Sequence, residues 1–130
     1  MKLPIKIETE SREPIYHQIE QQIKTLIASG YVSAEDPLPS IRALAKELEV
    51  SVITTRKVYQ NLESGGFIYT QQGKGTFVAS ISQLVKDDTK EMAIYHAFEQ
   101  AVDTAIQYDY HPIQINDVIQ KILKDKGVIS

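Results

Sequence analysis

The first apolar stripe of the chain predicts a helix over residues 14–29. Apolar side chains recur there every three or four residues, the spacing of one helix face, at Ile15, Ile19, Ile23, Leu26 and Ile27. Pro14 suits a first helical position, because its missing N–H would have no partner inside the helix. Gly30 is a natural stop. Residues 33–39 contain two prolines and two acidic residues, so we expect a loop there.

Two shorter helices follow, separated by a turn of three residues. Ser40 is the expected N-cap of a helix over 41–48, because its hydroxyl can accept from a free N–H of the first turn. The inward face of this helix is Ile41, Leu44, Ala45 and Leu48. Ser51 opens the next helix, over about residues 51–64, which ends at Gly65 and Gly66. Its inward stripe is Thr55, Val58, Tyr59 and Leu62.

After residue 66 the pattern changes from a helical to a strand period. Residues 67–70 and 76–78 are short runs of residues that favour strands, and they flank a tip that contains Gly73 and Gly75. This pattern predicts a β hairpin over 67–78. Two helices joined by a tight turn and followed by a hairpin are typical of a winged helix-turn-helix domain. We assign residues 1–79 to that domain.

The helical period returns from residue 82 and runs to about 108. After a break at 110–112, we expect a last helix over about 117–126, with Asn116 as its cap and Gly127 after its end. Residues 80–130 would then form a helical dimerisation tail. The predicted fold class is mainly α with a small β hairpin, a winged helix-turn-helix domain followed by a short helical tail.

Composition and charge narrow the classes of function. The chain of 130 residues has no cysteine, so disulfides and cysteine zinc sites are excluded. No apolar run approaches the roughly 20 residues of a membrane span, and the first residues lack a signal-peptide core; we expect no membrane partner and a cytoplasmic protein. The net charge is −3, but residues 40–79 carry +2 and residues 80–130 carry −3. This asymmetry permits a DNA-facing half without establishing one.

Four sequence blocks together resemble the GntR family of bacterial regulators. They are Leu38-Pro39-Ser40-Ile41-Arg42-Ala43-Leu44-Ala45, the Val50-Ser51 pair that opens a threonine-rich helix, Gly65-Gly66-Phe67-Ile68, and Gly73-Lys74-Gly75-Thr76-Phe77-Val78. The opening Pro14-Ile15-Tyr16-His17-Gln18-Ile19 and the short helical tail resemble the YtrA-type branch. The resemblance implies a DNA-binding transcription regulator, often a repressor of transporter operons. It also implies double-stranded DNA as partner and a DNA contact by Arg42.

The chain departs from the family pattern at three positions. Glu35 stands where the family usually has glycine, Val52 where many members have arginine, and Ile53 where the residue is often polar. The operator sequence of a relative therefore does not transfer directly to this chain.

In a winged helix-turn-helix domain, the helix predicted over about residues 51–64 would be the recognition helix. Its start offers five candidate contacts for the major groove, namely Val52, Ile53, Thr54, Arg56 and Lys57. Arg56 has the fork that grips guanine O6 and N7, and Val52 and Ile53 are suited to thymine methyl groups. Other interpretations stay open. Val52 or Ile53 would instead fill a gap against the preceding helix, and Arg56 would instead pair with Glu63 or Glu49.

Helix starts and the hairpin tip supply the remaining candidates for DNA contact. Ser40, Arg42 and Ser51 lie where free N–H groups and the helix dipole favour a phosphate, although each serine would also serve as a plain cap. At the tip, Gly73 and Gly75 allow a close approach to the minor groove, and Lys74 carries a charge into it. By itself, this tip would be an ordinary turn with a solvated lysine.

The tail supplies a candidate pairing surface. Its members are Ile94, Ala97, Phe98, Ala101, Val102 and Ala105. Small residues among large apolar ones permit helices to approach closely, so this face is suited to pairing two copies. Because winged-helix proteins usually bind DNA as pairs, we expect a homodimer that binds a two-fold symmetric site. The alternative is that this face packs on the chain's own winged-helix domain. The tail is too short for the larger effector domains of other branches, so a small-molecule effector is not evident.

Two other classes of function remain as alternatives. The first is a winged helix that binds protein partners and has lost DNA contact, which the acidic balance and Val52 favour slightly. The second is an enzyme, but no catalytic constellation is present. The three histidines lack the paired spacing of metal ligands, and we expect no metal and no cofactor.

Overall fold

The computed structural model describes residues 2–130. They divide into an N-terminal unit that ends at Ala93 and a C-terminal unit, Ile94–Ser130. The first holds α1 (Ile15–Ala28), α2 (Ile41–Leu48), α3 (Val52–Ser64) and the strands β1 (Ile68–Gln71) and β2 (Gly75–Val78). Helix α4 (Gln83–Gln107) begins in the first unit and ends in the second, which also contains α5 (Pro112–Asp125).

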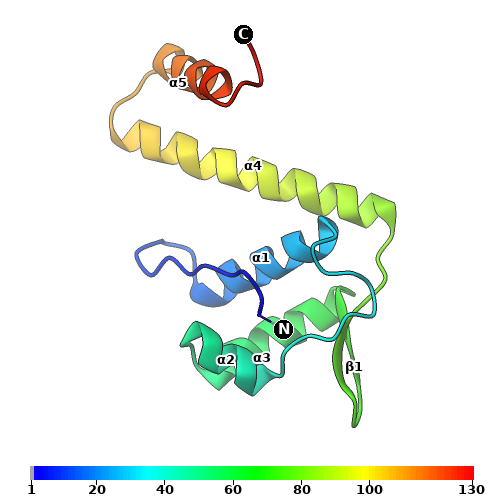
Figure 1. Cartoon of the computed structure of the whole chain (residues 1–130). Coiled ribbons are helices and arrows are strands. Elements are labelled where there is room, and N and C mark those ends of the chain that lie inside the picture. Colours follow the sequence, from blue (N-terminus) through cyan, green and yellow to red (C-terminus); the bar gives the residue numbers. More distant parts are fainter. Residues whose placement is uncertain (1) are drawn as a thin grey trace. The chain divides into compact units, whose positions relative to one another are not determined.

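The core of the N-terminal unit lies where α3 packs against both α1 and α2 (Figure 1). Its fully buried side chains come from all three helices and from β2: Ile19, Ile23, Leu44, Thr55, Val58, Leu62 and Val78. The inward stripes expected for α2 and α3 are confirmed, with Leu44 and Leu62 completely buried. The stripe of α1 is buried at three positions, while its first member, Ile15, is exposed.

Caps and glycines end the helices close to the expected residues. Ser40 and Ser51 are the N-caps of α2 and α3, as predicted. Gly30 and Gly66 have φ values of 82° and 81°, a conformation that glycine adopts without steric cost. Between α2 and α3, the turn places Glu49 in the same left-handed region, with φ 57°.

Two glutamines of α1 hold the segment that precedes the helix. The Gln22 side-chain amide accepts from the Lys6 N–H at 2.9 Å and donates to the Lys6 carbonyl at 2.7 Å. The Gln18 side-chain amide accepts from the Glu8 N–H at 2.8 Å and donates to the Glu8 carbonyl at 3.0 Å. The two amides thus satisfy the backbone groups of residues 6 and 8 as a neighbouring strand would. Leu3 of the same segment is buried in the core.

Strands β1 and β2 confirm the β hairpin predicted over 67–78, the wing of the winged helix, within one residue at each strand end. Its antiparallel register pairs Ile68 with Val78 and Gln71 with Gly75. The loop before α2 lies along β2, since Leu38 N–H donates to the Thr76 carbonyl at 2.9 Å. In the same loop Glu35 has φ 74°, so the backbone keeps the conformation that glycine favours although the residue differs. Its carboxylate accepts a hydrogen bond from the Tyr69 hydroxyl, which raises the pKa of Tyr69.

The last helix begins earlier than predicted. Instead of starting near residue 117 with Asn116 as cap, α5 starts at Pro112 with His111 at its N-cap. The prediction was wrong because Pro112 was taken as a breaker, whereas proline fits the first helical position. The His111 N–H is satisfied by Gln114 Oε1 at 2.8 Å, as in a capping box. Across residues 2–130, no helix combines the length and the apolar character needed to cross a membrane.

Candidate nucleic-acid interface

The start of α2 presents a capped helix terminus and an exposed arginine. Ser40 Oγ accepts from the Ala43 N–H at 3.1 Å, which satisfies one of the free donors of the first turn. Arg42 follows on the exposed surface of the same turn. A helix start carries partial positive charge, so this turn is suited to a phosphate group.

The start of α3 repeats this arrangement with a second serine. Ser51 Oγ accepts from the Thr54 N–H at 2.9 Å and donates to Thr54 Oγ1 at 2.8 Å. Both predicted contacts, Ser51 and Thr54, therefore contribute to the cap itself. Their hydroxyls therefore lie together at the helix start.

The exposed side of α3 carries the other candidates for base contact. Ile53 is 78% exposed, so it fills no gap in the core, whereas Val52 is half-buried. Arg56 is exposed, and within residues 2–130 it has no ion pair with Glu49 or Glu63. Glu63 instead accepts from Thr70 Oγ1 of β1 at 2.8 Å. The guanidinium of Arg56 is left available for a ligand.

Lys57 differs from Arg56 because its ammonium group contacts an aromatic ring of another helix. Its Nζ lies 3.9 Å from the centroid of the Tyr16 ring in α1. In the sequence, Tyr16 stands out only as part of a family motif. Periodicity cannot predict its contact with Lys57, because the two residues lie far apart in the chain.

Tyr59 joins the two helices of the candidate interface. Its hydroxyl donates to the Pro39 carbonyl at 2.6 Å, which ties the residue before the Ser40 cap to α3. The side chain is buried. Burial raises the pKa of Tyr59, and the nearby Glu47 carboxylate raises it further. The stripe in α3 predicted the burial of Tyr59 but not this hydrogen bond.

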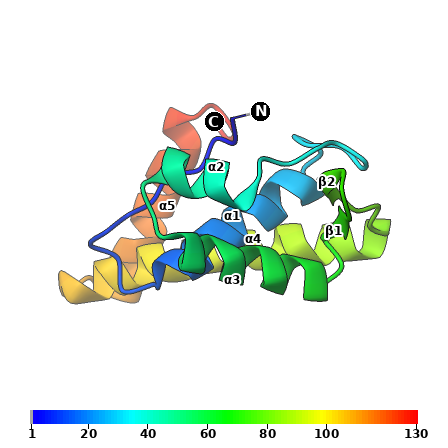
Figure 2. The same ribbon diagram turned by 90° about the horizontal axis from the view of Figure 1, so that it is seen from below.

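The wing tip projects from the end of β1 and the start of β2. Gly73 and Gly75 have φ values of 79° and 119°, which L residues with side chains rarely adopt. Between them, Lys74 is exposed, and its N–H closes the turn onto the Gln71 carbonyl at 2.9 Å. In two views α2 and α3 lie side by side, and the hairpin follows the end of α3 (Figure 1, Figure 2). All eleven candidate DNA contacts thus lie in the N-terminal unit.

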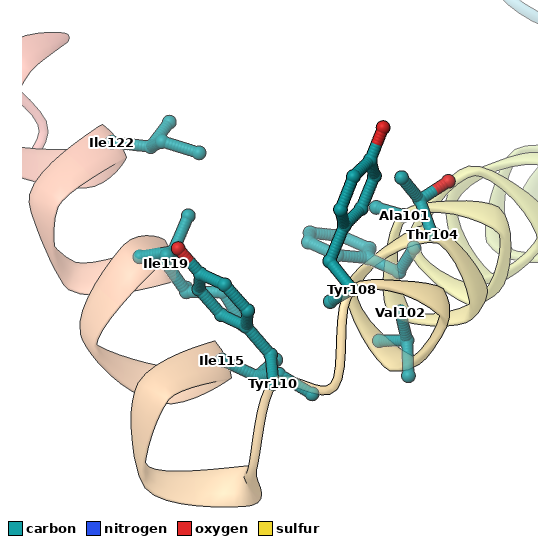
Figure 3. A pocket seen from close by; sticks show the side chains of 11 residues that line it. Ala101, Val102, Thr104, Tyr108, Tyr110, Ile115, Ile119 and Ile122 are labelled. Carbon is teal, nitrogen blue, oxygen red and sulfur yellow. The ribbon is translucent and has the colours of Figure 1, made fainter.

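The six candidate pairing residues all lie in the C-terminal unit. Four of them, Phe98, Ala101, Val102 and Ala105, line a groove of about 620 Å³ between α4 and α5 (Figure 3). The other walls include Tyr108, Tyr110, Ile115 and Ile119. Neither helix contains a buried residue. The sequence predicted the apolar face but not the groove, because its shape depends on where α5 begins and how it folds back.

Comparison with known proteins connects this geometry to a family. Residues 15–78 match the profile described as "Bacterial regulatory proteins, gntR family". The HTH-type transcriptional repressor YtrA of Bacillus subtilis (strain 168) is 31% identical over 121 residues, which cover 93% of this chain and 93% of that protein. The match therefore includes the tail as well as the winged helix.

Two solved structures are similar to this chain. YtrA from Sulfolobus acidocaldarius, a GntR-family transcription factor, has a TM-score of 0.58 and 41% identity over 73% of this chain and 97% of that chain. The AraR DNA-binding domain in complex with operator ORE1 has a TM-score of 0.50 and 34% identity, covering 57% of this chain and 90% of that one. In that second structure the related domain is bound to DNA.

Proposed function

Because this chain belongs to the GntR family of bacterial regulatory proteins, we propose that it is a homodimeric transcription repressor that binds an inverted-repeat operator. The family and the similar proteins are DNA-binding transcription regulators rather than enzymes. Repression is the activity named for YtrA of Bacillus subtilis. The cytoplasm, where bacterial DNA lies, is the expected site of action.

The DNA-binding part of this proposal rests on two exposed arginines that lie beside two capped helix starts. Arg42 follows the Ser40 cap, and Arg56 lies one turn after the Ser51 cap. Free N–H groups at such starts bind phosphate oxygens, while an arginine on a recognition helix can reach guanine in the major groove. The exposed Ile53 is suited to a thymine methyl group next to that contact.

The wing extends the proposed contact to the minor groove. Lys74 stands on a turn whose glycines have no Cβ to clash with a sugar-phosphate wall. The negative potential of a narrow minor groove attracts such a cation. We therefore assign DNA binding to residues 1–79, with Ser40, Ser51, Val52, Thr54 and Lys57 completing the contact set.

Dimerisation is assigned to residues 80–130. A face with Phe98 55% exposed and Ile94 59% exposed resembles the contiguous apolar patches that mark interaction sites. The alanines Ala97, Ala101 and Ala105 leave room for a close helix, and the groove between α4 and α5 offers it an apolar seat. Two copies would then present two recognition helices to the half-sites of a symmetric operator.

An electrophoretic mobility shift with the gene's own upstream DNA, at graded salt, tests this function. The intact chain should form a specific complex that weakens steeply as salt rises, because Lys and Arg release counterions from phosphates. Light scattering on the intact chain and on a chain truncated after Ala79 tests the tail: the first should be a dimer at micromolar concentration and the second a monomer. A folded chain that did not bind its upstream DNA would contradict the proposal. A monomeric intact chain would contradict it as well.

A further inference from the structure

The charged end of Lys57 lies over an aromatic ring of another helix. Lys57 is on the second turn of α3, and its Nζ is 3.9 Å from the centroid of the Tyr16 ring, in the first turn of α1. Tyr16 is partly buried and packs against the core, whereas Lys57 is exposed. The ring is therefore the fixed partner, and the lysine is the group that it orients.

An aromatic ring orients a cation without neutralising it, which a carboxylate in the same place would do. Two acidic side chains near Tyr16 in the chain, Glu13 and Glu20, have other partners. Glu13 Oε1 lies 2.7 Å from His17 Nδ1. Glu20 contacts Lys24 Nζ at 3.5 Å and accepts from Asn61 Nδ2 at 3.0 Å. The contact of Lys57 with another helix is thus with a neutral ring and not with either of these carboxylates.

This arrangement matters for binding because a free lysine loses rotamer freedom when it contacts a ligand. A lysine already held in place loses less, which is the general advantage of preorganisation. The ring covers one side of the ammonium group and leaves N–H donors on the other side for an oxygen. A phosphate of the DNA backbone is the acceptor that such a point charge suits.

We propose that Tyr16 is a positioning residue of the DNA interface, whose ring holds the Lys57 ammonium in the orientation from which it binds a backbone phosphate. The proposal rests on the assignment of Lys57 as a DNA contact. Tyr16 acts through Lys57 and not through its own hydroxyl.

Nuclear magnetic resonance of the free protein tests the pair without DNA. The Cε protons of Lys57 should be shifted upfield by the ring current of Tyr16. The shift should persist in Tyr16→Phe, which keeps a ring, and disappear in Tyr16→Leu. Unshifted Lys57 protons in the wild-type chain would overturn the proposal.

Titration with DNA tests the consequence. The probe is a fluorescein-labelled duplex of mixed sequence, about 30 base pairs long, in about 50 to 200 mM KCl, because a phosphate contact needs no particular sequence and is salt-dependent. Tyr16→Leu should weaken binding about two- to fivefold, as expected for one exposed cation–π contact. Tyr16→Phe should bind like the wild type. Lys57→Met should reduce the salt slope by about one charge, and adding Tyr16→Leu to it should cause no further loss.

Two results would overturn the positioning role. One is an equal loss from Tyr16→Leu with and without Lys57, since Tyr16 would then act alone. The other is a loss in Tyr16→Phe as large as in Tyr16→Leu, which would assign the effect to the hydroxyl. Tyr31→Leu is the matched control, because Tyr31 is 64% exposed in the loop after α1, and circular dichroism checks that each variant is folded. A wild-type chain that bound no duplex at the lower salt would contradict DNA binding itself, while the proton shift would still report whether the pair forms.

Discussion

Leu62 in α3 and Phe98 in α4 are both large apolar residues, yet the first is completely buried and the second is 55% exposed. The same contrast holds for the units to which they belong. The N-terminal unit has a core drawn from three helices and both strands of the hairpin, whereas the helices of the C-terminal unit contain no buried residue. Apolar surface is normally buried because its exposure to water is unfavourable. In the dimer that we propose, the apolar face of the second unit would be covered by the other copy, while the first unit has a core of its own.

The largest expected effect is on the free energy of unfolding when the core is truncated. Leu62→Ala should lower it by about 2–5 kcal/mol, because the change leaves a cavity among side chains that cannot fully collapse. Phe98→Ala should change the stability of the N-terminal unit by less than about 0.5 kcal/mol, as exposed positions usually do. Urea unfolding followed by circular dichroism at low protein concentration measures both. Similar losses from the two changes would remove the distinction between the units.

A charge on the tail should break the proposed dimer. Phe98→Asp would bury a carboxylate without a partner in an apolar interface, which is strongly unfavourable. We expect a monomer by light scattering and an operator affinity lower by about 100-fold or more, since two linked half-sites bind far more tightly than one. Met92→Asp is the matched control, because Met92 is also exposed and lies on the opposite side of α4 from Ala101. A Phe98→Asp chain that stayed dimeric would place the interface elsewhere.

Within the N-terminal unit, α3 and the wing should contribute differently to DNA binding. Arg56→Ala should cost on the order of 1–3 kcal/mol on the best operator and relax the preference at one base pair. Lys74→Ala should weaken binding to most sequences and reduce the salt slope by about one charge. Titrations of both variants on matched operator variants at two salt concentrations separate these roles. If Lys74→Ala left affinity and slope unchanged, the wing would be a structural turn only.

The smallest expected effect concerns the hydrogen bond between Tyr59 and Pro39. Tyr59→Phe should lower the free energy of unfolding by about 1 kcal/mol, because the Pro39 carbonyl loses its partner. Burial raises the pKa of Tyr59 in the folded state. The contribution of Tyr59 to the free energy of unfolding is therefore fully present below the pKa of the unfolded state, about 10, and is lost as the pH rises above that value. Denaturant melts of both proteins between neutral and alkaline pH should therefore converge at high pH. A constant difference at every pH would contradict the pKa shift.

The sequence predicted the elements of the N-terminal unit well because their local signals agree. The bounds of α2 match the expected 41–48, since Ser40 marks its start and a second serine, Ser51, marks the next helix. The hairpin was placed within one residue, because the glycines of its tip are required by their backbone conformation. The start of α5 was predicted wrongly, because Pro112 can either break a helix or begin one. Here it begins one, and the His111 N–H just before it donates to Gln114 Oε1.

Contacts between distant residues could not be predicted from the same patterns. The cation–π pair of Tyr16 and Lys57 joins two helices, and its partners carry no shared motif. Likewise, the amides of Gln18 and Gln22 appear in the sequence as ordinary polar positions, although they hold the backbone of residues 6 and 8. Periodicity reports which side of an element faces inward, but a polar side chain that spans two elements depends on their packing.

Hydroxyl-radical footprinting of the intact chain on its upstream DNA tests whether a dimer binds two symmetric half-sites. We expect two protected regions related by two-fold symmetry, with centres one helical turn or a multiple of it apart. Phe98→Asp should lose both at the same concentration. A single, unrepeated half-site protected with full affinity would contradict the dimeric reading of the operator.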